Sequence, residues 1–215
     1  MTQFVHHFVP APAPASTSAA TAAATAPTVL ALHGTGGTEN DLIPLAQSLW
    51  PGASILAVRG RISENGAARF FRRLSEGVFD LENLHQETAA LADFVAQSAT
   101  QLGFDAQNVW ALGYSNGANI AASLLLSRPE TLAGAILLRA MTPFSPSELP
   151  NLTGKPIFLA AGRFDPLVPA ENIENLASML EKSGANVTLR WENASHGLVG
   201  HEIDEARHFL AEKIV

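Results

Sequence analysis

The sequence predicts an α/β fold, in which a mostly parallel sheet of about seven strands is covered by helices on both faces. Short apolar runs alternate along the chain with longer segments whose apolar residues recur every three to four positions. The 215 residues suit one hydrophobic core. Apolar residues make up 47% of the chain and charged residues 15%, which is typical of a packed globule. We therefore expect a single domain with no large cap domain.

The first 27 residues are expected to belong to the same domain as residues 28–215. Residues 4–9 are predicted to add an edge strand. Residues 10–27 are almost wholly Ala, Pro, Ser and Thr, a composition that predicts a mobile loop. The first ten residues contain no Lys or Arg, and His6 and His7 interrupt their apolar run, so we expect no export signal.

The remaining strands are predicted from short apolar runs at residues 28–32, 54–58, 109–112, 135–138, 157–160 and 187–191. Helices are predicted from helical spacing at residues 39–50, 81–102, 116–127, 170–182 and 201–213. Stop signals follow several of these helices, namely Gly103, Pro129 and Gly184. Residues 59–80 and 141–155 lack either pattern and are predicted to be loops that wall a pocket at the carboxyl edge of the sheet.

The charge pattern excludes some classes of partner. The formal charge is −7, and no stripe of Lys and Arg is present that could neutralise phosphates, so nucleic acid is not expected as a partner.

No apolar run approaches the roughly 20 residues that cross a bilayer, so no membrane segment is expected. The chain has no cysteine, which removes disulfides and a thiol nucleophile. A cytoplasmic protein is the simplest interpretation.

The clearest catalytic pattern is Gly113-Tyr114-Ser115-Asn116-Gly117, which lies between a predicted strand and a predicted helix. A serine on such a sharp turn stands clear of the backbone, and the flanking glycines allow neighbouring segments to approach it. The competing interpretation is a chance match in which the glycines only make a turn. Because a serine hydroxyl is a weak nucleophile, the catalytic interpretation requires a base and an orienting acid elsewhere.

Two candidates follow later predicted strands in the order Ser, Asp, His that α/β-hydrolases show. Asp165 follows the strand near residue 160, and His196 follows the strand that ends near residue 191. Asp165 could instead be a turn residue or helix cap, and His196 a surface histidine. The other histidines lie in the edge strand or on predicted helices, apart from His33.

His33 begins a glycine-rich turn, Gly34-Thr35-Gly36-Gly37, directly after the first long strand. We expect the backbone N–H groups of Thr35 and Asn116 to form an oxyanion hole, and His33 to hold the loop in shape. A phosphate site is the alternative for such a turn, but neither nucleotide-binding glycine pattern is present. No metal-ligand spacing is present either, so we expect neither metal nor cofactor.

With these features the chain resembles the carboxylesterase/phospholipase family of small α/β-hydrolases, which includes acyl-protein thioesterases and dienelactone-hydrolase-like enzymes. The likeness spans Thr28 to about Leu210. Several segments resemble the branch of bacterial carboxylesterases related to hydroquinone-responsive hydrolases: Arg59-Gly60, Ser63-Glu64-Asn65-Gly66, Arg69-Phe70-Phe71-Arg72-Arg73, Gly77-Val78-Phe79 and Gly113-Tyr114-Ser115-Asn116-Gly117-Ala118-Asn119.

The resemblance implies hydrolysis of small carboxylic esters without a cofactor, with Ser115, Asp165 and His196 as the triad. The Ala/Pro/Thr stretch before Thr28 is longer than the family needs. Dienelactone hydrolases proper use a cysteine nucleophile, which this chain lacks.

The pocket walls are predicted from apolar side chains in the two loops: Phe70, Phe71, Phe79, Met141 and Phe144. Plain core packing is the alternative for each of them. Glu64 and Arg69 are expected to form an ion pair that shapes the loop.

The function that this pattern favours is a serine carboxylesterase acting on a small-molecule ester. An acyl thioesterase or lysophospholipase is the alternative, since the same triad cleaves thioesters. A non-catalytic binding protein with the same fold is a further alternative. Association of two copies as a homodimer is compatible with the sequence, but nothing in the pattern selects a surface.

Overall fold

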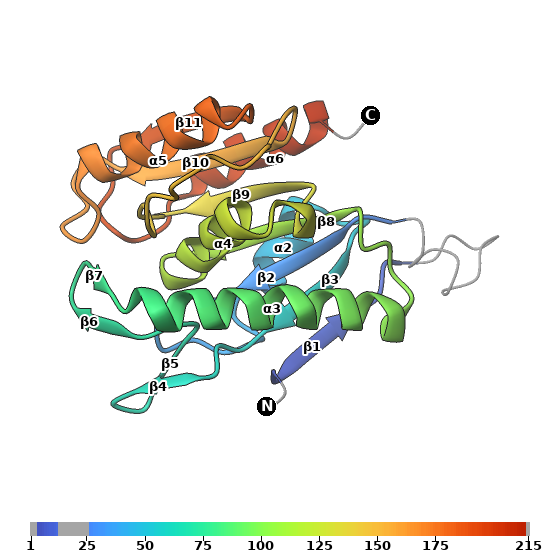
Figure 1. The fold of residues 1–215 in the computed structure, drawn as a ribbon. Helices are drawn as coiled ribbons and strands as arrows, with labels where there is room; N and C mark the ends of the chain where they lie inside the picture. The colour runs from blue at the N-terminus through green and yellow to red at the C-terminus, as the bar shows by residue number, and fades with distance from the viewer. Residues whose placement is uncertain (1–3, 13–25, 214–215) are drawn as a thin grey trace.

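The computed structural model describes residues 4–12 and 26–213. Most of the loop predicted at residues 10–27 lies outside the described residues. The described chain forms a seven-stranded sheet with the order β1-β3-β2-β8-β9-β10-β11. Only β1 runs antiparallel to its neighbour, so the prediction of a mostly parallel sheet in an α/β fold is confirmed (Figure 1).

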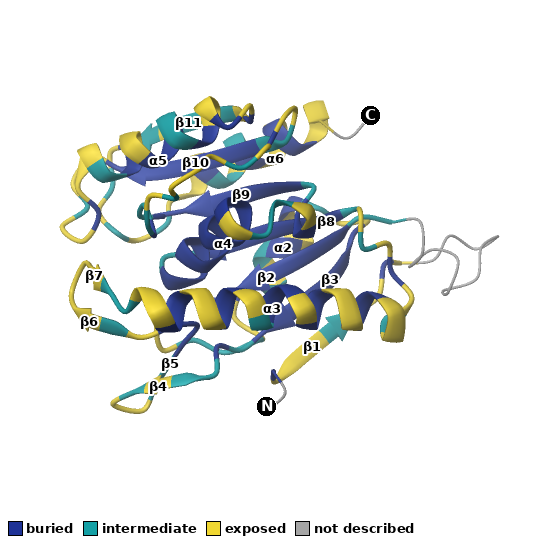
Figure 2. Cartoon of the chain, in the orientation of Figure 1, coloured by how far each residue is buried: buried dark blue, intermediate teal, exposed yellow. Residues whose placement is uncertain are grey.

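The strands of this sheet closely match the predicted runs. They are β1 (His6–Val9), β2 (Thr28–Leu32), β3 (Ser54–Val58), β8 (Val109–Tyr114), β9 (Gly134–Leu138), β10 (Pro156–Gly162) and β11 (Asn186–Glu192). Every residue of β2, β3 and β9 is buried, because helices cover both faces (Figure 2). That burial explains why these strands appear as continuous apolar runs rather than alternating patterns.

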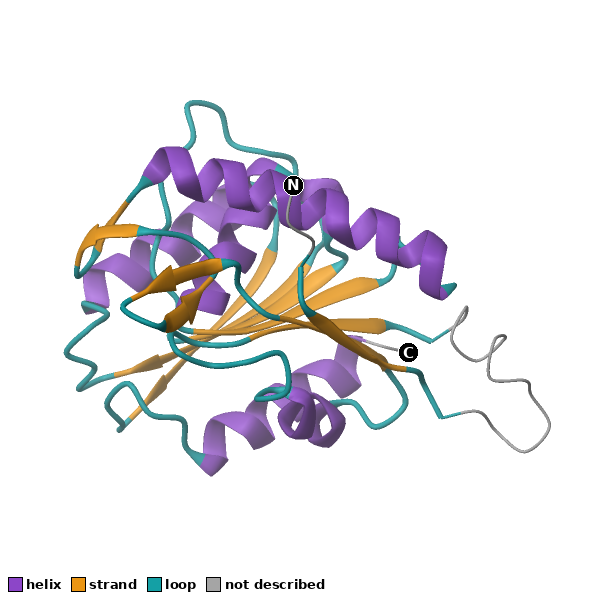
Figure 3. Cartoon of the chain, turned by 90° about the horizontal axis from the view of Figure 1, so that it is seen from below, coloured by secondary structure: helices purple, strands orange, loops and turns teal. Residues whose placement is uncertain are grey.

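Helices pack on both faces of the sheet (Figure 3). One face carries α3 (Leu81–Leu102), α4 (Asn116–Ser127) and α5 (Ala170–Lys182), and the other carries α2 (Ile43–Leu49) and α6 (Gly200–Lys213). Each face has its own buried apolar cluster. A short 3₁₀ helix, η1 (Pro129–Thr131), follows α4. In the described part of the chain, no helix is long and apolar enough to cross a membrane.

The long helix α3 shows how local sequence sets helix ends. The Asp80 side chain accepts a hydrogen bond from the Asn83 backbone N–H and caps the start. Gly103 ends the helix with a φ of 75°, a left-handed conformation that glycine adopts without strain. Helix α2 is shorter than the predicted range of 39–50 because Pro44 lies in its first turn, where proline is tolerated.

The prediction of an irregular loop over residues 59–80 is wrong in one respect. This segment forms two small hairpins, one from β4 (Ile62–Glu64) and β5 (Ala67–Arg69) and one from β6 (Arg73–Ser75) and β7 (Val78–Phe79). Asn65 and Gly66 join the first pair with φ values of 52° and 87°. An Asn-Gly pair is a strong signal for such a two-residue turn, and the sequence contains it. Residues 141–155 form a loop, as predicted.

Candidate active site

Ser115 lies at the turn between β8 and α4 with a φ of 53° and a ψ of −114°, a conformation that non-glycine residues rarely adopt. Its backbone N–H donates to the Leu138 carbonyl at 2.9 Å. A Cβ atom on Gly117 would lie 2.0 Å from the Leu32 carbonyl oxygen, and one on Gly113 would lie 2.6 Å from the Cα of Ala118. Glycine is therefore required at both positions, because strand and helix pass too close for a side chain.

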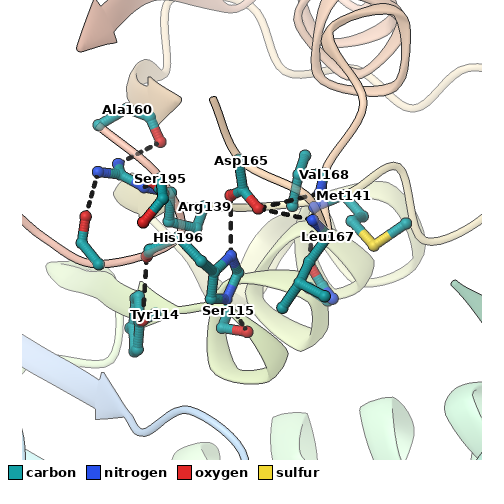
Figure 4. Close-up of polar contacts among 12 residues, drawn as sticks. Tyr114, Ser115, Arg139, Met141, Ala160, Asp165, Leu167, Val168, Ser195 and His196 are labelled. Atoms are coloured by element: carbon teal, nitrogen blue, oxygen red, sulfur yellow. Dashed lines mark hydrogen bonds and ion pairs between the residues drawn. The ribbon is translucent and has the colours of Figure 1, made fainter. Parts of the chain in front are cut away.

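The three residues predicted as a triad meet in space. His196 Nε2 lies 2.9 Å from Ser115 Oγ, and His196 Nδ1 lies 2.8 Å from Asp165 Oδ2 (Figure 4). The Asp165 side chain is only 1% exposed, whereas that of His196 is 20% exposed. This arrangement can take a proton from Ser115 and hold the resulting imidazolium against a buried carboxylate.

The Asp165 carboxylate is also fixed by the backbone that follows it. Its Oδ1 accepts hydrogen bonds from the N–H groups of Leu167 at 2.8 Å and Val168 at 3.2 Å (Figure 4). Both contacts leave Oδ2 facing His196. Asp165 therefore lies where an orienting acid is predicted and also makes the turn contacts that were the alternative for it.

The loop after β2 is organised by His33, which is 1% exposed. Its Nε2 accepts a hydrogen bond from the Gly60 N–H at 3.0 Å, and its Nδ1 contacts the Gly34 carbonyl. Burial lowers the pKa of His33 below 6.5, which favours the neutral ring that this pair of contacts requires. The structure therefore gives His33 the loop-shaping place that we expected.

Thr35 and Asn116, predicted as oxyanion-hole donors, both line the cavity that contains Ser115. Asn116 is the first residue of α4, where backbone N–H groups have no partner within the helix. Arg69 donates to the Thr35 hydroxyl oxygen at 2.6 Å and lies 3.1 Å from Glu64. The expected ion pair of Glu64 and Arg69 is thus present, and it supports the Thr35 loop. Donation by the two amides to an oxyanion stays a prediction.

The cavity at Ser115 has a volume of about 310 Å³ and brings together residues from the loops at this edge of the sheet. Phe79 and Met141, two of the five predicted wall residues, line it together with apolar Leu167 and Val168 and the charged Arg73. The remaining lining residues are polar, charged or glycine: Thr35, Arg69, Glu76, Gly77, Tyr114, Ser115, Asn116, Asn119, Arg139 and His196.

Three of the predicted wall residues do not line this cavity. Phe70 and Phe71 are fully buried in the core, where Phe70 packs on His33 and Phe71 packs on Phe79. Phe144 packs edge-on against His85. For Phe70 and Phe71 the core-packing alternative is correct, because the chain after β5 places Arg69 at the cavity and buries the two aromatic side chains that follow it. Phe144, in the loop after β9, is partly buried and packs against the core.

Sequence reasoning missed several residues that contact the site. Tyr114 donates from its hydroxyl to the His196 carbonyl at 3.1 Å. Asn119 accepts a hydrogen bond from the Met141 N–H at 2.7 Å, which ties the loop after β9 to α4. Arg139 contacts the loop that carries His196 (Figure 4). A charged residue directly after the apolar strand that ends at Leu138 was the available signal. Within residues 4–12 and 26–213, no group of three His, Asp or Glu side chains is placed to hold a metal ion.

Comparison with known proteins identifies relatives over most of the chain. A family model described as phospholipase/carboxylesterase matches residues 75–214. The putative hydrolase MhqD of Bacillus subtilis (strain 168) is 47% identical over 187 residues, which cover 87% of this chain and 94% of that protein.

Solved structures are similar over nearly the whole chain. A carboxylesterase from Bacillus cereus has a TM-score of 0.92 at 43% identity, with 98% of this chain and 95% of that chain covered. The structure of YahD with malic acid has a TM-score of 0.88 at 30% identity, with 98% of this chain and all of that chain covered.

Proposed function

The chain belongs to the phospholipase/carboxylesterase family and has its α/β-hydrolase fold, and on that premise we propose that it is a serine carboxylesterase that hydrolyses small esters. The observation that carries the proposal is the continuous contact from Ser115 Oγ through His196 to Asp165. A serine hydroxyl needs a base at this distance to act as a nucleophile.

In the proposed reaction, Ser115 Oγ attacks the ester carbonyl while His196 Nε2 takes its proton. The carbonyl oxygen becomes negatively charged and is stabilised by the backbone N–H groups of Thr35 and Asn116. His196 then gives its proton to the leaving alcohol, and an acyl-enzyme on Ser115 remains. Water attacks this ester with His196 again as base, which releases the acid and restores Ser115.

A preference for small esters is supported by the cavity. Its volume of about 310 Å³ is at the lower end of the range of about 300 to 1,000 Å³ for small-molecule sites. Arg73, Gly77 and Phe79 come from the hairpin of β6 and β7 and line the cavity together with Met141 from the loop after β9. Charged Arg73 and Glu76 in this wall suit a short acyl group better than a long alkyl chain.

The test is hydrolysis of p-nitrophenyl esters from acetate to palmitate by the wild type, Ser115→Ala and a control, Ser127→Ala, which changes an exposed serine at the far end of the same helix. We expect a short-chain optimum that Ser115→Ala reduces about a thousand-fold or more and Ser127→Ala leaves unchanged. Turnover that survives in Ser115→Ala would refute the assignment of the nucleophile. A long-chain optimum lost in that variant would instead indicate a thioesterase or lysophospholipase.

A further inference from the structure

Arg139 is placed unusually for a charged side chain. It follows β9 at the carboxyl edge of the sheet, its side chain has 0% exposure, and its φ is 57°. Left-handed backbone conformations are costly for residues other than glycine, and they persist where surrounding contacts hold them. The hydrogen bonds of the Arg139 guanidinium are contacts of this kind.

The guanidinium has five N–H groups, and the structure provides five contacts. Nε donates to the Ser195 carbonyl at 3.1 Å, and Nη2 donates to the Gly197 carbonyl at 2.7 Å. Nη1 donates to the Ala160 carbonyl at 3.3 Å. Nη1 and Nη2 also form a two-pronged ion pair with Glu202, whose side chain is equally buried.

The two carbonyls from Ser195 and Gly197 flank the residue that bears the proposed base, His196. The carbonyl of His196 itself accepts the Tyr114 hydroxyl at 3.1 Å, so three consecutive carbonyls are held by side chains. Residues 193–199 belong to no helix or strand. Side chains therefore hold the carbonyls of residues 195–197, whereas the Ala194 carbonyl accepts the Phe164 backbone N–H at 3.0 Å.

Glu202 extends the same arrangement to the next element. It lies near the start of α6, and its Oε1 also accepts the Val199 backbone N–H at 2.7 Å. Arg139 and Glu202 together thus connect β9, β10, the His196 loop and α6. Because every guanidinium N–H has a protein acceptor, Arg139 has no donor left for a neutral ester, although it lines the cavity.

We propose that Arg139, paired with Glu202, is a positioning residue that holds the His196 imidazole at Ser115 and so sets the rate of acylation. This inference rests on the proposed serine-hydrolase function. A displacement of a catalytic group by about 1 Å can slow a reaction about 100-fold. Loss of the contacts to Ser195 and Gly197 should therefore lower kcat and leave KM for a neutral ester nearly unchanged.

The experiment separates positioning from stability with the double variant Arg139→Met/Glu202→Met. Removing Arg139 alone leaves a buried carboxylate without its counter-charge, which destabilises the fold strongly, whereas replacing both charges with apolar side chains often preserves stability. The double variant keeps the core filled but provides no donor for the Ser195 and Gly197 carbonyls. The control is Arg190→Met/Glu205→Met, which removes an exposed ion pair between β11 and α6.

Three quantities are measured for each variant: the thermal midpoint, kcat and KM for p-nitrophenyl butyrate, and the rate at which a fluorophosphonate labels Ser115. We expect the Arg139→Met/Glu202→Met protein to be folded, with kcat and the labelling rate lowered about 10- to 100-fold and KM within about threefold of the wild type. The control should keep wild-type values. A folded double variant with wild-type kcat and labelling rate would overturn the proposal.

Arg139→Lys decides the question if the double variant does not fold. Lysine keeps the charge beside Glu202 but cannot span both carbonyls, because it lacks the planar fork of arginine. We expect a folded protein with a lowered kcat, and an unchanged kcat would overturn the proposal. Ser115→Ala is assayed alongside: turnover retained there would refute the proposed function, whereas its loss together with normal Arg139 variants would refute only the positioning role.

Discussion

Asp165→Asn tests the orienting role proposed for the Asp165 carboxylate, and the structure shows which atoms change. Oδ1 accepts the N–H groups of Leu167 and Val168, and Oδ2 faces His196 Nδ1 at 2.8 Å. Asparagine has one oxygen, which should stay on the two backbone donors, since the opposite orientation would direct its NH₂ group at them. The NH₂ group of the variant should therefore face His196.

The consequence is a change of tautomer. A donor opposite Nδ1 favours an unprotonated Nδ1, so the ring proton moves to Nε2. Nε2, which lies 2.9 Å from Ser115 Oγ, can then no longer accept the serine proton. We expect kcat to fall about 10⁴-fold, a rise of about 5.4 kcal/mol in the barrier.

The assay is hydrolysis of p-nitrophenyl butyrate at pH 7.5, with circular dichroism to confirm that the variant is folded. Asp105→Asn is a matched control, because Asp105 is an exposed aspartate that also accepts a hydrogen bond from the backbone N–H two residues later, at 2.8 Å. The control should keep full activity. A folded Asp165→Asn protein that loses less than tenfold in kcat would refute this reasoning.

Two further predictions concern stability. Gly117→Ala should lower the urea midpoint and the activity, because the new Cβ atom would lie 2.0 Å from the Leu32 carbonyl oxygen. The control is Gly52→Ala, whose Cβ meets nothing within 4 Å, so neither quantity should change. Equal urea midpoints for the two variants would contradict the predicted clash at Gly117. Burial lowers the pKa of His33, so below about pH 6.5 the unfolded chain binds more protons at this residue than the folded protein, and stability is lost as the pH falls. The urea midpoint should therefore drop less between pH 7.5 and 5.5 in His33→Gln than in the wild type. An equal drop in the two proteins would argue against protonation of His33 as a cause of the lost stability.

Most elements of the fold were predictable because their signals are local. The limits of β2 and β3 and of α3 and α4 follow the predicted ranges residue by residue. Strands buried on both faces must be continuously apolar, and helices between them must be apolar on one side. The hairpin turn at Asn65 and Gly66 also has a local signal, the Asn-Gly pair. The residues on either side of it, however, are too polar to form an apolar run that would predict strands.

The places of the three proposed triad residues could also be expected from the sequence. A parallel sheet brings the carboxyl ends of its strands to one edge, so residues that follow separate strands become neighbours. Ser115 follows β8, Asp165 follows β10 and His196 follows β11. The order of the strands then places all three within reach of one another.

The aromatic residues near the site could not be assigned in the same way. Phe70, Phe71 and Phe79 all occur within ten residues of one segment, yet only Phe79 lines the cavity. Whether an aromatic ring faces a cavity or a core depends on the twist of a short hairpin and on which side chains lie opposite. Sequence spacing does not contain that information.

The sequence by itself determined the α/β architecture, the strained serine turn and the order of the three candidate catalytic residues, because each depends on neighbouring residues or on the geometry of any parallel sheet. Only the tertiary structure decided which side chains hold the segment that carries His196. Arg139 reaches a carbonyl 56 residues away and a carboxylate 63 residues away. No local periodicity records such contacts, since they arise only when separate segments pack together and a buried guanidinium must find an acceptor for each of its N–H groups.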